Sequence, residues 1–300
     1  MRTAIVVGTM LLTFTLSLGC ESAKGALKAG IDARRVELSA PAAPTPPPGV
    51  TFTARAPALG DKAEATSLND MTMEASVALG KKALKMSLQT TETETRTEEV
   101  LAAAGGAVTK LRVTYTAKTN VMKEGKRERK LRNPLAGNTY VVELKDGKLT
   151  ALDARAKPVK GTALKLLKSS YETLGKPDPM VAALPATPLT KGQKVEALGK
   201  AIKESLQGKA AKGMTVGDVT VAFRDQEGDL GVFDVTAKVA LVEKPMKFEM
   251  DLKGQVGMRL GDGQPARLTL EGPVTASSAD RRLKMEGTGT MKLSMTRRSI

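Results

Sequence analysis

The chain of 300 residues contains no histidine and no tryptophan, and it has a single cysteine, Cys20. Without histidine there is no Ser-His-Asp or Cys-His nucleophile pair, no imidazole general base and no imidazole zinc site. Hydrolysis by two carboxylates stays formally open, but carboxylates that alternate along strands are expected to be solvated. The sequence therefore predicts a protein that is not an enzyme and that uses no metal and no cofactor.

Aromatic residues are scarce as well. They make up 3% of the chain, whereas 41% of the residues are hydrophobic and 14 are methionine. A core built from such residues is mainly aliphatic, with flexible thioether side chains filling irregular gaps. The scarcity of aromatic rings also removes the stacking platforms that nucleic-acid-binding proteins use, so no nucleic-acid partner is expected.

The amino terminus carries a long stretch without charge. Arg2 is followed by the uncharged residues 4–18, after which Glu21 and Lys24 occur. This run is shorter than the roughly 20 apolar residues that a membrane-spanning helix needs. A basic start followed by a short apolar segment is typical of a secretory leader, so residues 1–19 are predicted to be a signal peptide.

Residues 16–20 read Leu-Ser-Leu-Gly-Cys, and this short motif resembles the lipobox of bacterial lipoproteins. The resemblance covers five residues, and Ser17 stands where the family most often has leucine. It implies that the leader is cut before Cys20 and that Cys20 receives fatty acyl groups such as palmitate. The protein would then be a membrane-anchored envelope lipoprotein, on the periplasmic face of the outer membrane. A plain secretory leader with an incidental cysteine is the alternative.

The segment after Cys20 has no hydrophobic periodicity. Residues 40–49 read Ala-Pro-Ala-Ala-Pro-Thr-Pro-Pro-Pro-Gly, and proline-rich segments of this kind adopt extended polyproline conformations. Residues 20–65 are therefore predicted to form the lipidated cysteine and a disordered tether. Residues 66–300 are predicted to form a single β-rich domain.

Basic residues outnumber acidic ones by 47 to 32, which gives a formal net charge of +15. Such a surface favours anionic partners, which in an exported protein are lipid head groups, lipopolysaccharide or peptidoglycan. The densest basic run is residues 123–132. It is either a solvated loop or an electrostatic contact with an anionic membrane or envelope polymer. The candidate contact residues are Lys123, Lys126, Arg127, Arg129, Lys130 and Arg132.

Apolar and polar residues alternate with a period of two over most of residues 68–152 and 215–295. Long runs of this kind, separated by turns such as Asp146-Gly147, are typical of antiparallel strands joined in hairpins. The predicted fold is mainly β with a helical insert. It is a long curved antiparallel sheet or incomplete β-barrel of about ten strands. Whether the two strand sets form one sheet or two stays open.

The period changes between residues 159 and 208. Apolar residues recur there every three or four positions over 163–174 and 195–206, which predicts two helices packed on or across the sheet. Asp178 precedes Pro179 and is expected to cap a short helical turn rather than to act in catalysis. The architecture is similar to the outer-membrane lipoprotein carrier and receptor (Lol) fold, a similarity that carries no residues across.

Nine of the 14 methionines fall on predicted apolar strand faces: Met71, Met73, Met86, Met246, Met250, Met258, Met285, Met291 and Met295. They are core residues if the helices close tightly on the sheet, and they line a concavity suited to acyl chains if the sheet curls without closing. The candidate ligand-binding residues are Met246, Phe248, Met250, Met258, Met285, Met291 and Met295.

Two functional hypotheses follow from these patterns. The first is a non-enzymatic, membrane-anchored lipoprotein that binds a hydrophobic or amphipathic ligand, such as a lipid or a lipoprotein, in the cell envelope. The second is a structural or interaction module that docks through its basic surface on envelope polymers or on a protein complex. An open apolar cavity would favour the first hypothesis, and a filled core would favour the second.

Overall fold

The computed structural model describes residues 49–79, 82–208, 214–243, 246–278 and 284–300. Eleven strands form one antiparallel, curved and unclosed sheet, which three helices accompany. Strands account for 64% of the structure. The fold class predicted from the sequence is confirmed, and both strand sets belong to a single sheet.

Most strands are long, and short turns connect many of them. The strands are β1 Lys62–Leu79, β2 Lys82–Ala104, β3 Ala107–Glu124, β4 Arg127–Leu131, β5 Thr139–Lys145, β6 Lys148–Asp153, β7 Met214–Glu227, β8 Leu230–Glu243, β9 Met246–Arg259, β10 Pro265–Ser278 and β11 Lys284–Ser299. The helices are α1 Gly161–Ser170, α2 Pro179–Ala182 and α3 Glu196–Gly208. All three helices lie in the segment where the sequence predicts the insert.

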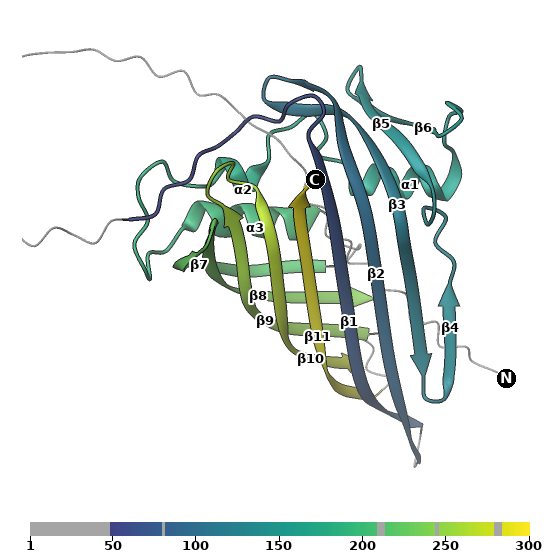
Figure 1. The fold of residues 1–300 in the computed structure, drawn as a ribbon. Helices are drawn as coiled ribbons and strands as arrows, with labels where there is room; N and C mark the ends of the chain where they lie inside the picture. The colour runs from purple at the N-terminus through teal and green to yellow at the C-terminus, as the bar shows by residue number, and fades with distance from the viewer. Residues whose placement is uncertain (1–48, 80–81, 209–213, 244–245, 279–283) are drawn as a thin grey trace, which may run out of the picture.

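The strand order across the sheet is β6-β5-β3-β2-β1-β11-β10-β9-β8-β7, and β4 also pairs with β3. Most neighbours in the sheet are also neighbours in sequence. The pairing of β1 with β11 is different, because it joins the two ends of the folded chain (Figure 1). This pairing, in which Met71 lies opposite Met291, makes the two strand sets continuous.

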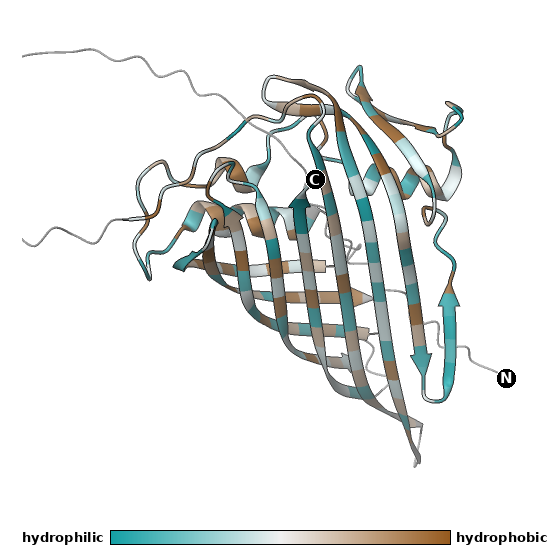
Figure 2. Ribbon diagram, in the orientation of Figure 1, coloured by the Kyte–Doolittle hydropathy of each residue, from teal (hydrophilic) through white to brown (hydrophobic). Residues whose placement is uncertain are grey.

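The three helices lie on the concave side of the sheet (Figure 1). Helix α3 packs along the edge strand β7, and helix α1 packs beside β6. Hydrophobic and hydrophilic residues alternate along β8 to β11 (Figure 2), so each of these strands has one buried and one exposed face. This alternation is the period of two that predicted the strands from the sequence.

The folded body begins earlier than the sequence pattern indicates. The predicted boundary at residue 66 lies inside β1, which begins at Lys62. Residues 49–61, which the sequence assigns to the tether, contact the folded body. Phe52 stacks on Phe233 with the ring centroids 5.7 Å apart. The segment forms no helix or strand beyond the isolated bridge between Val50 and Leu189, so its sequence carries no hydrophobic period that could have predicted its packing.

Two hydrophobic clusters fill the inner face. The first, which we call the methionine cluster, lies between α3 and the strands from β7 to β11 and β1. It is built around Met71, Met73, Met180, Met214, Met246, Met250, Met258, Met285, Met291 and Met295, with Phe223, Phe233 and Phe248.

The second cluster, which we call the tyrosine cluster, lies between α1 and strands β3, β5 and β6. It contains all three tyrosines of the chain, and no described methionine belongs to it. Its buried members are Val100, Val108, Leu111, Val113, Tyr115, Leu135, Tyr140, Val142, Ala151, Leu167, Tyr171 and Leu174.

Candidate functional site

All seven candidate ligand-binding residues lie in the methionine cluster. The side chains of Met246, Phe248, Met250, Met258, Met285, Met291 and Met295 are at most 5% exposed. Leu198 and Ile202 of α3 belong to the same cluster, so the helix packs over the strands that carry the candidate residues. The seven side chains therefore come together as packed core residues.

The basic run at residues 123–132 forms a hairpin rather than a loop, because β4 pairs with the end of β3. Strand β4 is exposed along its whole length and is hydrophilic over most of it (Figure 2). The one ion pair within the run joins Lys123 Nζ to Glu128 Oε2 at 3.7 Å. The structure thus brings five of the six candidate contact residues together on one exposed hairpin, and the sixth, Arg132, directly follows β4.

The excess of positive charge extends beyond this hairpin. Residues 105–176, which include β3 to β6 and α1, contain 17 Lys and Arg against six Asp and Glu, a net charge of +11. Residues 214–300, which include β7 to β11, contain 13 Lys and Arg against 12 Asp and Glu, a net charge of +1. Of the 17 cations, Lys118 is the buried one. We call the exposed cations of residues 105–176 the basic surface.

A row of charged side chains crosses the inner face of the sheet between the two clusters. On β2 the inward positions run from Leu88 in the methionine cluster to Val100 in the tyrosine cluster. The side chains between them include Glu92, Glu94, Arg96 and Glu98, which are 2–7% exposed. The expectation that carboxylates on the strands are solvated is therefore wrong for these three glutamates.

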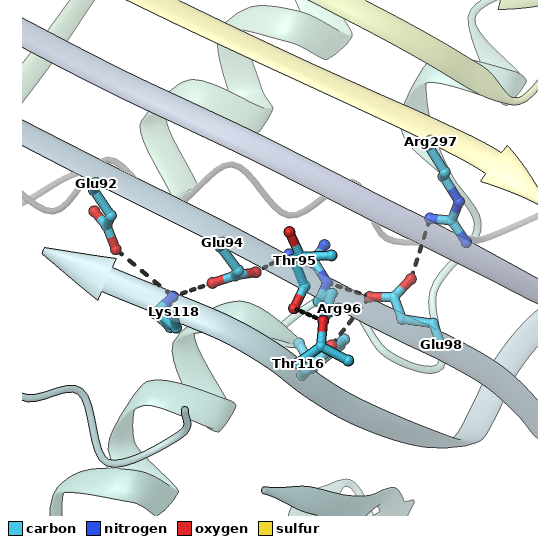
Figure 3. Close-up of polar contacts among 9 residues, drawn as sticks. Glu92, Glu94, Thr95, Arg96, Glu98, Thr116, Lys118 and Arg297 are labelled. Carbon is cyan, nitrogen blue, oxygen red and sulfur yellow. Dashed lines mark hydrogen bonds and ion pairs between the residues drawn. The ribbon is translucent and has the colours of Figure 1, made fainter. Parts of the chain in front are cut away.

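Arg96 is the centre of this row (Figure 3). Its guanidinium donates to Glu94 through Nη1 and to Glu98 Oε1 through Nε, the latter at 2.8 Å. The hydroxyl of Tyr171 donates to the same Glu98 oxygen at 3.0 Å. Helix α1 ends at this point, so the polar row is joined to the tyrosine cluster through a hydrogen bond.

Two further cations complete the row (Figure 3). Lys118 of β3 donates to Glu94, and its Nζ lies 3.7 Å from Glu92 Oε1. Arg297 of β11 lies 3.3 Å from Glu98 Oε2. Three carboxylates thus meet three cations, and the group is neutral overall. We call these six residues the ionic band: Glu92, Glu94, Arg96, Glu98, Lys118 and Arg297.

The carboxylates of the ionic band differ in how well they are compensated. Burial alone would raise the pKa of Glu94 and Glu98, but the neighbouring cations outweigh burial and lower both pKa values below the usual 4.5. For Glu92 burial prevails and raises the pKa, because among the described residues Lys118 is its one ion-pair partner and the neighbouring Glu94 carboxylate raises the pKa further. Burial also raises the pKa of the Tyr171 hydroxyl.

A small pocket lies at one end of the ionic band, where Glu98, Arg297 and Tyr171 meet residues 55–63 and the turn between β9 and β10. It encloses about 60 Å³, which is room for a few water molecules. Its four cations are all paired with acids: Arg55 with Asp61, Lys62 with Glu99, Arg259 with Asp262 and Arg297 with Glu98. None of the candidate ligand-binding residues lines it.

The pocket also contains a buried polar atom without a partner. Gln264 is 6% exposed, and its Oε1 accepts no hydrogen bond from any residue that the structure describes. Because the lining charges are already compensated, the pocket suits a small uncharged group that donates a hydrogen bond. It is too small for an acyl chain.

Sequence reasoning missed the ionic band, although its signal is present. Threonine occupies the odd positions from 91 to 97, and charged residues occupy the even positions from 92 to 98. This is a period of two with polar residues on both faces, which indicates a strand but not which face is buried. A regular charged face on a long strand is the feature that could have revealed it.

Within the described residues, no group of three or more acidic side chains is arranged to hold a metal ion. In the same part of the chain, none of the helices combines the length and the apolar character needed to cross a membrane.

No protein-family model matches the chain, and no curated protein matches it. Among solved structures it is similar to the COG4313 outer membrane channel from Pseudomonas putida F1, with 10% identity, a TM-score of 0.19, and coverage of 82% of this chain and 97% of that chain. A DUF1329 family protein from Desulfovibrio piger ATCC 29098 is 9% identical, with a TM-score of 0.15 and coverage of 77% and 85%. Both TM-scores are too low to support an argument about fold or function.

Proposed function

We propose that the protein is a non-enzymatic lipoprotein of the bacterial cell envelope whose folded body docks on an anionic envelope component through the basic surface. The observation that carries this proposal is the concentration of charge. Residues 105–176 hold a net charge of +11 out of +15, and nearly all of their cations are exposed.

The two groups of cations in the molecule have different roles. Arg96 and Lys118 are buried against carboxylates and are compensated within the protein. Lys126 and Arg127 in the hairpin and Lys165 on α1 are exposed and form no ion pair among the described residues, whereas Arg112 and Lys123 pair with Glu99 and Glu128 at the surface. Uncompensated charge of one sign attracts anionic surfaces over about one Debye length, roughly 10 Å at 0.1 M salt. Docking of this kind weakens as the salt concentration rises.

The experiment compares two charge variants of the full chain that carry Cys20→Ser, so that binding through an acyl anchor is not measured. The test variant carries Lys126→Gln, Arg127→Gln, Arg129→Gln and Lys130→Gln. The control variant carries Arg224→Gln, Lys238→Gln, Lys253→Gln and Lys292→Gln, which are exposed cations of β7 to β11. Both variants lose four positive charges.

Binding is measured by sedimentation with isolated bacterial envelopes at increasing salt. We expect the test variant to bind at least about tenfold more weakly than the control variant. If both variants lose the same amount of envelope binding, net charge acts without a defined surface. If the parent protein does not bind envelopes at all, the proposal is wrong.

The proposed lipid anchor is Cys20, which lies outside the described residues. It is supported by the resemblance of residues 16–20 to a lipobox and by the proline-rich segment that follows. Metabolic labelling with a fatty-acid analogue should label the protein and not its Cys20→Ser variant, which should also leave the membrane fraction in high salt. Labelling of the Cys20→Ser variant would contradict the anchor.

Binding of a hydrophobic ligand is the second candidate function. The observation that favours it is that the seven candidate residues converge in one cluster rich in flexible thioethers beneath α3. Because these side chains are packed, a ligand would have to displace α3. Mass spectrometry of protein purified from envelopes should then detect a stoichiometric lipid, and protein free of lipid would count against this function.

A further inference from the structure

The strand register divides the β3–β4 hairpin into two faces. Residues that lie opposite each other in an antiparallel pair share a face. Met122 lies opposite Arg129, and Asn120 lies opposite Leu131. Met122 packs against the methionine cluster, so Arg129 and Leu131 belong to the inner face of the sheet. Arg127 belongs to the same face because it lies two residues before Arg129.

Strand β2 extends this inner face past the end of β3. The last pair between the two strands joins Leu88 to Glu124. Beyond it, Met86 and Leu84 follow on the same face as Leu88, because they lie two and four residues away. Leu84 is 51% exposed and Leu131 is 39% exposed. We call the resulting row the lip, defined by Leu84, Met86, Met122, Arg127, Arg129 and Leu131. Leu131 is level with Glu92 of β2 and Leu84 lies eight residues farther along that strand, so the two leucines mark the ends of a row roughly 26 Å long with the arginines between them.

The lip combines free cations with exposed apolar side chains. Neither Arg127 nor Arg129 forms an ion pair within the part of the chain that the structure describes. Glu124, opposite Arg127, is the hairpin's one acidic residue on this face, so the face keeps a net positive charge. The ion pair of Lys123 with Glu128 belongs to the opposite, outer face.

This combination matches a lipid surface better than a polymer. Guanidinium groups bind phosphate through two parallel hydrogen bonds, and aliphatic side chains beside cations enter the boundary between head groups and acyl chains. An anionic polymer would use the two arginines but would leave Leu84 and Leu131 in water. A bilayer uses both sets of side chains.

We propose that the lip docks on a bilayer of anionic phospholipids, with Arg127 and Arg129 on the lipid phosphates and Leu84 and Leu131 entering between the head groups. This inference rests on the proposed function and specifies its anionic component. All five residues of β4 are exposed, so the strand presents both arginines and Leu131 without burying them.

The test is flotation of the full chain carrying Cys20→Ser with vesicles of phosphatidylglycerol and phosphatidylcholine in equal parts. Two variants change the lip: Arg127→Gln with Arg129→Gln, and Leu84→Ser with Leu131→Ser. Two matched controls leave it intact: Lys123→Gln with Lys130→Gln on the outer face of the same hairpin, and Leu152→Ser with Val242→Ser, which are 36% and 40% exposed elsewhere. Thermal unfolding confirms that each variant is folded.

Each lip variant should bind about tenfold more weakly than its matched control, and vesicles of phosphatidylcholine alone should bind none of the proteins. If the Arg127→Gln, Arg129→Gln variant and the Lys123→Gln, Lys130→Gln control lose equal amounts of vesicle binding, the inner face has no special role. Full binding by the Leu84→Ser, Leu131→Ser variant would overturn insertion and leave an electrostatic contact.

Cell-wall sacculi free of lipid separate this inference from the proposed function. Binding to sacculi but not to phosphatidylglycerol vesicles overturns the lip as a lipid site and leaves the proposed function intact. Failure to bind vesicles, sacculi and whole envelopes overturns both.

Discussion

The two clusters differ in chemistry although one sheet carries both. The methionine cluster is uncharged and is filled largely by thioether, phenylalanine and aliphatic side chains. Most of its members lie in residues 214–300, whose net charge is +1. The tyrosine cluster is smaller, borders the ionic band through Tyr171, and lies under the basic surface. Nonspecific burial stabilises the first cluster, whereas the second depends on particular polar partners.

The largest expected effect comes from breaking the ionic band at its centre. Arg96→Met leaves Glu94 and Glu98 buried without their common partner, and such a change costs about 3–5 kcal/mol of unfolding free energy. Urea denaturation measures it. The matched control is Arg224→Met, whose exposed ion pair with Asp234 should contribute less than about 1 kcal/mol. Equal costs for the two variants would mean that the ionic band is solvated.

Carboxylates of the ionic band should also make the stability of the protein depend on pH. The pKa of Glu94 is lowered by folding, so its contribution is complete above the unfolded value near 4.5 and is lost as the pH falls through the lower folded pKa. Unfolding free energy of the parent protein should therefore decrease below pH 4.5, and Glu94→Gln should be less stable at neutral pH but decline less in acid.

Glu92→Gln is the control for that profile. Burial raises the pKa of Glu92, so its charged form opposes folding at neutral pH, and its protonation in acid removes this opposition. Replacement by glutamine should therefore cost much less than Glu94→Gln when denaturation is measured at pH 7. If Glu92→Gln lowers the unfolding free energy more than Glu94→Gln does, Glu92 and not Glu94 is the carboxylate that the neighbouring cations compensate better.

A smaller effect is expected at the junction of the ionic band with the tyrosine cluster. Tyr171→Phe removes the hydroxyl that donates to Glu98 and should cost about 1–3 kcal/mol, because a buried carboxylate loses a donor. Tyr140→Phe removes a hydrogen bond to a neutral acceptor, the Pro134 carbonyl at 3.2 Å, and should cost about 0.5–1.5 kcal/mol. Chemical denaturation that ranks the two variants in the opposite order would contradict this difference.

The smallest effect is expected for a substitution that keeps the volume of a side chain in the methionine cluster. Met258 is fully buried, and Met258→Leu keeps its volume and apolar character, so it should cost less than about 1.5 kcal/mol. Met258→Ala, which leaves a cavity, should cost about 2–5 kcal/mol and shows that the site is core. If denaturation gives similar costs for both variants, the thioether has a specific role that nonspecific packing does not explain.

Local elements were predictable because their signals are short in range. The pattern predicts a helix over 195–206, and α3 spans Glu196–Gly208. Asp178 caps α2 as expected, since its Oδ1 accepts a hydrogen bond from the Met180 backbone at 2.9 Å. The turn at Asp146 and Gly147 has positive φ at both residues, 51° and 70°, as a two-residue hairpin requires.

Contacts between distant segments were not predictable in the same way. Alternation in β1 and β11 reveals two strands, but nothing in either strand specifies that they pair. Phe52 stands in a segment without periodicity, and its stacking on Phe233 depends on where β8 passes. The candidate contact residues of the hairpin were identified by their charge, whereas their division between two faces required the register.

The sequence by itself determined the class of fold, the absence of imidazole chemistry, the excess of positive charge and the positions of most elements, because each depends on composition or on spacing over a few residues. The tertiary structure alone decided that Glu92, Glu94 and Glu98 are buried, and that two clusters of different chemistry share one sheet. Burial depends on what covers a face, and the residues that cover β2 come from segments far away in the chain.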